Sequence, residues 1–249
     1  MTGQDEPELD LVSGSSALDD AVFRPVRAGN SLEDTTARLM QTIRLGVVPP
    51  GRALPSERDL AVRFSVSRDT VREAIRELSD TGYLRSRRGR YGGTFVSDPL
   101  PAPPVAPVVA PSAAELDDLL GLRDILEVGA ARAAAARTLD GEARATLWTR
   151  LGEVAAASAA DYRRLDSRLH LTIGEIVGVP SLVSVMADNR TRINELLDSF
   201  PLLPRNIEHS NRQHEAIVMA ILAGNEEGAA DAVREHLEGS AALLRGFLA

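Results

Sequence analysis

Residues 54–78 read LPSERDLAVRFSVSRDTVREAIREL, and this stretch decides the fold of the first half of the chain. Ser56 and Ser67 each precede a helical pattern, and a serine in that position caps a helix by accepting a backbone N–H. Apolar residues recur at helical spacing in both patterns, so each helix has one face to bury. The sequence therefore predicts two short helices joined by a tight turn, the second running to about Ser79.

The second helix leaves its charged residues on the exposed face, beginning with Arg68 and Arg72 in its first turns. An arginine there can enter the major groove of DNA, where it bridges two acceptors of guanine or holds a phosphate. Segments 82–86 and 93–97 then alternate like two strands around an arginine-rich tip. The order of helix, turn, basic helix and basic hairpin predicts a winged helix-turn-helix. It favours DNA binding over an ordinary helical subdomain with a solvated arginine face.

The distribution of charge agrees with that interpretation. The formal net charge is −8 at pH 7, yet residues 51–97 contain ten arginines against six acidic residues. Residues 98–249 contain 14 arginines against 22 acidic residues. One basic module is thus embedded in an acidic chain, as expected of a protein with a dedicated DNA-binding part.

Composition excludes several other classes of protein. The chain has 249 residues and no cysteine, which excludes a disulfide scaffold, a thiolate zinc site, an iron–sulfur site and a cysteine nucleophile. No apolar run approaches the ~18 residues of a membrane span, and no signal-peptide pattern opens the chain. We therefore expect a cytoplasmic protein that does not contact membranes.

Four segments follow from composition and periodicity. Residues 1–30 are acidic and lack periodicity, which predicts a mostly disordered tail. Residues 31–97 add a first helix, beginning at Ser31, to the winged helix-turn-helix. Residues 98–112 are proline-rich and predict a semi-rigid extended linker. Residues 113–249 are helical throughout, so a mainly α chain is predicted, ending in an antiparallel all-α bundle of six or seven helices.

Asp166 and His170 are four residues apart and so lie on one side of a predicted helix. His214 and His236 lie on the apolar faces of two further helices. Such side chains, pointing from three helices into a bundle, can bind Zn²⁺, Ni²⁺, Mn²⁺ or Fe²⁺. The alternative is that each histidine is a hydrogen-bonded core residue. We expect one divalent ion per chain at these four residues, and we exclude His209, which lies near a helix start.

Arg123 and Asn189 interrupt apolar stripes in the same region, and Arg192 lies one turn along from Asn189. These three residues are candidates for an anion pocket. A buried arginine can hold a carboxylate through two parallel hydrogen bonds. Arg123 could equally form an intrahelical or dimer-interface salt bridge with Glu127. Both interpretations stay open at this point.

The first half of the chain resembles the DNA-binding domain of GntR-family bacterial transcription regulators. The resemblance rests on residues 54–61 and 66–78, on Gly82-Tyr-Leu84 and on Gly93-Thr-Phe-Val96. It implies that the residues contacting DNA are Arg58, Ser67, Arg68, Thr70, Arg72 and, at the wing tip, Gly89. The wing departs from the family pattern by one extra bulky residue within 88–93.

Residues 165–182, 211–217 and 223–236 are similar to the FCD ligand-binding domain of the FadR subfamily. That resemblance implies an all-α domain in which one Asp and three His hold a metal ion, and the ion helps to capture a small carboxylate effector. Leu169 stands where the family often has Phe.

Together these features predict a homodimeric regulator that binds double-stranded operator DNA and responds to a small carboxylate effector at a metal site. Two subunits are expected because a two-fold operator needs two recognition helices. One alternative is a metal-responsive repressor that senses the ion itself. Another is a metal-dependent enzyme that uses the Asp/His₃ centre, but the chain lacks a nucleophile elbow, a phosphate loop and an HExxH helix. We therefore expect no enzymatic activity.

Overall fold

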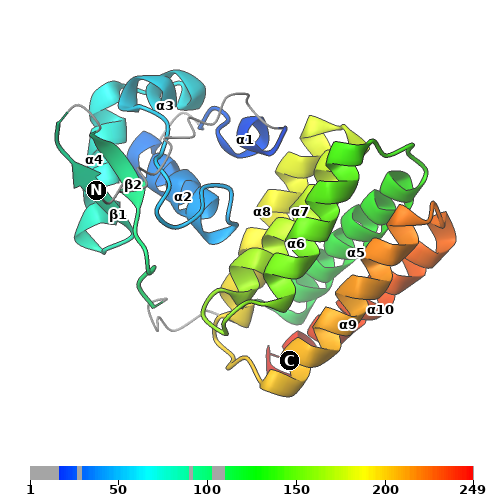
Figure 1. Ribbon diagram of the computed structural model, residues 1–249. Coiled ribbons are helices and arrows are strands. Elements are labelled where there is room, and N and C mark those ends of the chain that lie inside the picture. The colour runs from blue at the N-terminus through cyan, green and yellow to red at the C-terminus, as the bar shows by residue number, and fades with distance from the viewer. Residues whose placement is uncertain (1–16, 27–29, 90–91, 103–109, 249) are drawn as a thin grey trace, which may run out of the picture.

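The computed structural model describes residues 17–26, 30–89, 92–102 and 110–248. The chain has two main parts, a mixed N-terminal domain and a helical domain that continues to the C-terminus (Figure 1). The described residues are mostly helical, and their strands form a single two-stranded hairpin. The prediction of a mainly α chain with a small β-hairpin wing and a C-terminal helical bundle is confirmed.

The N-terminal domain follows the predicted order of elements. These are α2 (Ser31–Arg44), α3 (Glu57–Phe64), α4 (Arg68–Asp80), β1 (Leu84–Arg87) and β2 (Gly93–Val96). Both predicted serine caps form, because Ser56 Oγ and Ser67 Oγ each accept the backbone N–H three residues on, at 3.2 and 3.0 Å. Ser65 ends α3 in the left-handed conformation, at φ 56°, which makes the tight turn before α4.

One apolar core holds the N-terminal domain together. Phe64 of α3 is fully buried with the inner faces of α2 and α4. The strands pair antiparallel with Leu84 opposite Val96, and both side chains are buried. The hairpin is therefore anchored at its base, while residues 85–89 are exposed.

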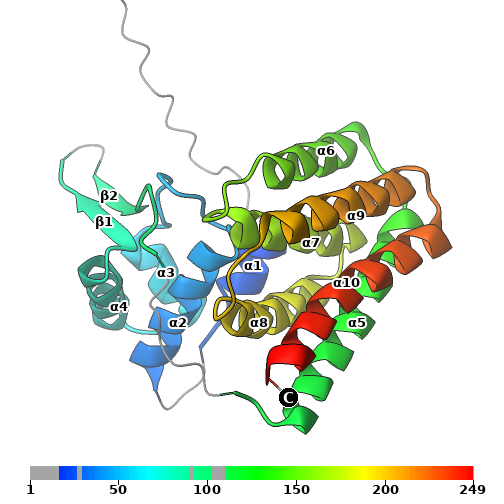
Figure 2. The same cartoon turned by 90° about the horizontal axis from the view of Figure 1, so that it is seen from below.

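The helical domain consists of six helices within residues 113–248. They are α5 (Ala113–Ala135), α6 (Gly141–Ala155), α7 (Tyr162–Val177), α8 (Pro180–Leu197), α9 (Pro204–Leu222) and α10 (Glu226–Leu248). Gly178, at φ 75°, ends α7 and Pro180 begins α8, as glycine and proline do at helix ends. The helices pack as a bundle, with α5 and α10 side by side in both views (Figures 1 and 2).

Residues 17–26 contradict the prediction of a mostly disordered tail over residues 1–30. Ala17–Val22 form helix α1, and the side chains of Leu18 and Val22 are fully buried. A six-residue helix is too short to be stable alone, so its order comes from packing against distant parts of the chain. Residues 1–16 and 27–29 lie outside the described part of the chain.

The predicted proline-rich linker is described only at its ends, residues 98–102 and 110–112, which contain neither helix nor strand. Leu100 packs against the core of the N-terminal domain. The prediction for residues 103–109 falls outside the described residues. None of the described helices is both long and apolar enough to cross a bilayer.

Candidate functional site

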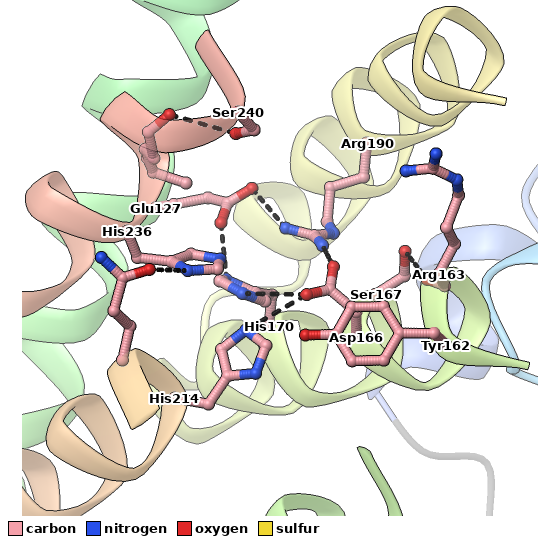
Figure 3. Close-up of polar contacts among 12 residues, drawn as sticks. Glu127, Tyr162, Arg163, Asp166, Ser167, His170, Arg190, His214, His236 and Ser240 are labelled. Atoms are coloured by element: carbon pink, nitrogen blue, oxygen red, sulfur yellow. Dashed lines mark hydrogen bonds and ion pairs between the residues drawn. The ribbon is translucent and has the colours of Figure 1, made fainter. Parts of the chain in front are cut away.

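Four side chains predicted as metal ligands meet inside the helical domain (Figure 3). Asp166 and His170 come from α7, His214 from α9 and His236 from α10. Each offers one ligand atom, and these atoms all lie within 4.8 Å of one another. The three rings are buried, with centroids 4.5 to 5.4 Å apart. Residues up to 70 positions apart in the sequence thus form one compact donor set.

Neighbouring side chains fix the rings and leave other nitrogen atoms without a partner. His170 Nδ1 lies 2.6 Å from Glu127 Oε2, and His236 Nδ1 lies 3.2 Å from Gln213 Oε1. The opposite nitrogen of the first ring, His170 Nε2, is buried without a hydrogen bond, as is His214 Nδ1. A buried polar atom without a partner is costly. His214 Nε2 lies 3.1 Å from Asp166 Oδ1. A ring with one nitrogen held by an acceptor and the other unpaired is typical of metal-binding histidines.

The surroundings favour neutral imidazoles, the form that binds a metal. Burial lowers the pKa of His170, and the nearby Arg190 lowers it further, while Glu127 opposes both. Burial also lowers the pKa of His236 far below its ordinary value, and the other two rings add to that effect. Both rings are therefore uncharged at neutral pH.

Two buried arginines balance two carboxylates beside the histidines, the buried Glu127 and Asp166, whose side chain is 15% exposed. Arg190 lies 2.7 Å from Glu127 and also pairs closely with Asp166. Arg123 Nε lies 3.1 Å from Glu127 Oε1, the oxygen that Arg190 also contacts. Arg123 also donates to Ser240 Oγ at 2.7 Å. Burial alone would raise the pKa of both carboxyl groups, but the guanidinium of Arg190 outweighs it with help from neighbouring groups, and both pKa values stay well below normal. The four groups remain charged and mutually neutralised.

The three predicted effector residues differ in burial, because Arg123 and Asn189 are buried and Arg192 is exposed. Arg123 is buried and makes the intrahelical salt bridge that was one of its two interpretations. Asn189 is buried, its Nδ2 donates to Leu119 O at 3.0 Å, and its Oδ1 has no hydrogen-bond partner. Arg192 is exposed and lies near Glu115, so the prediction that it helps to line an inward pocket is wrong.

The inward arginine of α8 is Arg190, which the sequence analysis missed. Its side chain is only 2% exposed. A signal was present, because Val183, Met186 and Ile193 are buried and residue 190 shares their helical stripe, whereas residue 192 is rotated by about 200° from it. An arginine within an apolar stripe is expected to be buried and therefore to pair with a carboxylate. Gln213, which holds His236, carried no comparable signal.

The residues expected to contact DNA lie on the surface of the N-terminal domain. Ser67 and the side chains of Arg58, Arg68 and Arg72 are exposed, while Thr70 is half-buried. α4 and the hairpin lie on the side of this domain away from the helical domain (Figures 1 and 2). The start of the predicted recognition helix is therefore accessible to a duplex.

Charged neighbours hold the recognition helix arginines in place. Arg72 lies 2.8 Å from Asp69 and 3.4 Å from Glu57, and Arg68 reaches the same Glu57 at 4.0 Å. These groups are largely exposed, so the pairs contribute little to stability and exchange readily for a phosphate. Arg68 and Arg72 are therefore exposed and can bind a DNA phosphate in place of their present carboxylate partners.

The wing has a glycine where its backbone requires one. Gly89 is exposed and has φ 107°, a conformation that residues with a side chain rarely adopt. Arg87 lies 4.5 Å above the ring of Phe95 in the facing strand. Arg90 and Tyr91, also predicted at the tip, lie outside the described residues.

Comparison with known proteins agrees with both parts of this arrangement. The family of bacterial regulatory proteins, gntR family, matches residues 32–96, and the FCD domain matches residues 118–239. A protein of Escherichia coli (strain K12), named for regulation of an L-lactate dehydrogenase operon, is 29% identical over 227 residues, covering 87% of this chain and 86% of its own. A protein of Mycobacterium gastri, named as the HTH-type transcriptional regulator RmpR, is 30% identical over 226 residues, covering 87% and 81%.

The solved structure of E. coli McbR/YncC has the same fold. It superposes with a TM-score of 0.53 at 20% identity and covers 88% of this chain and 99% of its own. Both family matches occur in the order in which the two domains occur here. The chain therefore belongs to the GntR family of bacterial transcription regulators, and its helical domain is an FCD domain.

Proposed function

We propose that this regulator binds one divalent ion per chain through Asp166, His170, His214 and His236, and that a small organic anion at the ion controls its affinity for operator DNA. The observation that carries the proposal is the pair of buried ring nitrogens without hydrogen bonds, His170 Nε2 and His214 Nδ1, within a cluster that includes a carboxylate. One carboxylate and three imidazoles suit Zn²⁺, Ni²⁺, Mn²⁺ or Fe²⁺. When bound, the ion would supply positive charge that attracts a carboxylate.

The charge balance of the cluster favours an anionic effector. Two carboxylates, Glu127 and Asp166, are already neutralised by two guanidinium groups, Arg123 and Arg190. A divalent ion would add two positive charges to a buried site, and buried net charge is costly unless it is compensated. An organic acid would supply the missing negative charge. This argument favours an organic-acid sensor over a repressor that senses the metal alone.

The first compounds to test are small 2-hydroxy acids. The E. coli relative is named for an L-lactate dehydrogenase operon, so L-lactate is a reasonable member of the first set. Elemental analysis of the native protein should find one transition metal per chain. The melting temperature should then rise when a 2-hydroxy acid is added, at constant pH, to protein loaded with Zn²⁺, Ni²⁺ or Mn²⁺. Absence of stoichiometric metal together with no effect of any added ion would reject the proposal.

We assign DNA recognition to the start of α3, the start of α4 and the wing, through Arg58, Ser67, Arg68, Thr70, Arg72 and Gly89. The support is the exposure of all but the half-buried Thr70 and the basic charge of residues 51–97. Such a regulator acts where bacterial DNA is, in the cytoplasm. Selection from a random duplex library should return an inverted repeat, because two recognition helices read two half-sites. Binding should weaken steeply as salt is raised.

The proposed homodimer has a surface that suits it, on α5. The exposed positions in the middle of this helix are Asp118, Gly121, Leu122, Ile125, Gly129 and Arg132. Ile125 is 72% exposed, a large exposed fraction for an isoleucine. Asp118 and Arg132 each lie seven residues from it, and the two glycines each lie four residues from it. Antiparallel packing about a two-fold axis at Ile125 would place each Asp118 opposite the partner's Arg132, with glycines permitting close approach.

Light scattering tests this interface directly. Ile125→Asp should convert a dimer into a monomer, because the charge would meet its own copy on the two-fold axis. Met219→Asp is the matched control, since Met219 is also half-exposed and lies on α9. Dimers in both variants would show that another surface joins the subunits.

A further inference from the structure

Residues 17–26 connect the two domain cores, although they lie outside both matched family segments, 32–96 and 118–239. Leu18 and Val22 of α1 are fully buried in the core of the helical domain. The next residue, Phe23, is buried in the core of the N-terminal domain. The chain thus passes from one core to the other between two adjacent residues. Both views show α1 between the two halves of the molecule (Figures 1 and 2).

On the side of the helical domain, α1 packs on α7 and α8. The backbone N–H of Leu18 donates to Glu175 Oε1 of α7 at 3.3 Å, and Ser184 Oγ of α8 donates to the carbonyl of Ala21 at 3.3 Å. Arg24 pairs with Asp188 of α8. These are the two helices whose inner faces carry Asp166, His170 and the buried arginine of the candidate metal site.

On the side of the N-terminal domain, the segment holds the first helix of the helix-turn-helix. The ring of Phe23 stacks on Phe64 of α3 with centroids 5.8 Å apart. Val26 N–H donates to the carbonyl of Phe64 at 3.0 Å, and the guanidinium of Arg63 lies 5.4 Å from the Phe23 ring. Apolar, aromatic and backbone contacts therefore fix this end of the segment.

The direct contacts between the domains are apolar at the end of α2, where Leu45 is fully buried in the core of the helical domain and Val47 packs against both cores. Between α2 and α8 they are polar. Arg38 and Gln41 of α2 reach Asp188 of α8 at 3.0 and 3.1 Å, and Arg44 pairs with Asp198. Part-exposed ion pairs contribute little to stability. Two domains joined by a small surface and a linker are expected to move relative to one another. The buried side chains of residues 17–26 add apolar anchoring to that of Leu45 and Val47.

We propose that residues 17–26 form an interdomain clasp, which holds the N-terminal domain on α7 and α8 and so fixes the placement of the recognition helix α4. The clasp rests on its own contacts and is independent of whether a metal binds. The clasp makes the position of the DNA-binding surface depend on α7 and α8, the two helices that carry Asp166, His170 and Arg190 of the candidate metal site.

Electron–electron distance measurement between two spin labels tests the clasp in the full chain. The natural chain has no cysteine, so Asp80→Cys on α4 and Glu142→Cys on α6, both at exposed positions, would carry the labels alone. An excess of unlabelled natural chain would suppress distances between subunits. The double variant Phe23→Ala/Arg24→Ala should broaden the interdomain distance distribution at least about twofold.

The matched control is Arg245→Ala/Phe247→Ala, which also removes one arginine and one phenylalanine. In the natural chain Arg245 pairs with Asp117 and the Phe247 ring contacts Phe200, and both contacts lie within the helical domain. The control should keep the narrow distribution. If the clasp double variant does not fold, Arg24→Asp, which opposes Asp188 at a part-exposed position, should broaden the distribution. A distribution as narrow as that of the natural chain, in the folded double variant or in Arg24→Asp, would overturn the proposal.

Discussion

Arginines of the N-terminal domain and of the helical domain differ in what their surroundings allow them to do. The side chains of Arg68, Arg72 and Arg76 are 62, 58 and 67% exposed, and their carboxylate partners lie on the surface. Arg123 and Arg190 are 4 and 2% exposed and share Glu127. An exposed guanidinium exchanges its partner for a phosphate at little cost. A buried one cannot leave its carboxylate without stranding a charge.

Removal of one buried arginine should have the largest effect on stability. Arg190→Met should lower the free energy of unfolding by ~3–5 kcal/mol, because it strands the charge of Asp166 and leaves Glu127 with Arg123 alone. Urea unfolding followed by circular dichroism measures it. Arg192→Met is the control two residues on, and its exposed side chain predicts a change within about 0.5 kcal/mol. Equal effects of the two variants would show that burial does not separate the arginines.

Metal loading should have the next largest effect. At a free-ion concentration of ~100 times Kd, binding to the folded state adds ~2.7 kcal/mol to the stability of the helical domain. Zn²⁺, Ni²⁺ or Mn²⁺ should therefore raise the melting temperature, and EDTA should reverse the change. His214→Ala should abolish the response, while His209→Ala, at an exposed position, should retain it. A response that survives in His214→Ala would place the ion elsewhere.

Exposed arginines should affect DNA binding without affecting stability. Arg68→Ala and Arg72→Ala should each weaken binding of the selected operator by ~1–3 kcal/mol if the side chain reads a base, and should leave the melting temperature unchanged. Fluorescence anisotropy at fixed salt measures the affinity. Arg245→Ala removes an exposed arginine from the helical domain and should bind DNA normally. Undiminished affinity in the Arg68/Arg72 double variant would refute the assigned surface.

Acid should weaken the metal-free helical domain in a window set by its histidines. The folded-state pKa values of His170 and His236 lie below their ordinary value of 6.5. Below that pH the unfolded chain binds protons that the folded chain does not, so stability falls as pH falls, by up to ~1.4 kcal/mol per pH unit for each ring. Urea unfolding in EDTA between pH 7 and pH 5.5 measures the slope. Stability that is flat across this window would contradict the neutral, buried state of the rings.

Local signals accounted for much of the fold. The caps at Ser56 and Ser67 and the break at Gly178 act within one or two turns, and the structure has them where the sequence indicates. The i, i+4 spacing of Asp166 and His170 likewise sufficed to place both on one face. Tertiary information was needed to see that α7, α9 and α10 bring the three histidines to a common point.

The sequence by itself determined the order of elements, the basic surface of α4 and the four donor residues, because helix caps, apolar periodicity and charge are properties of short segments. The apolar stripe of α8 indicates that Arg190 faces inward, but only the tertiary structure shows its partners, because Glu127 and Asp166 lie 63 and 24 residues away. The tertiary structure also decided that residues 17–22 are helical, because six residues gain too little from their own hydrogen bonds to offset the loss of conformational entropy. Their order depends on apolar contacts with α7 and α8, more than 140 residues along the chain.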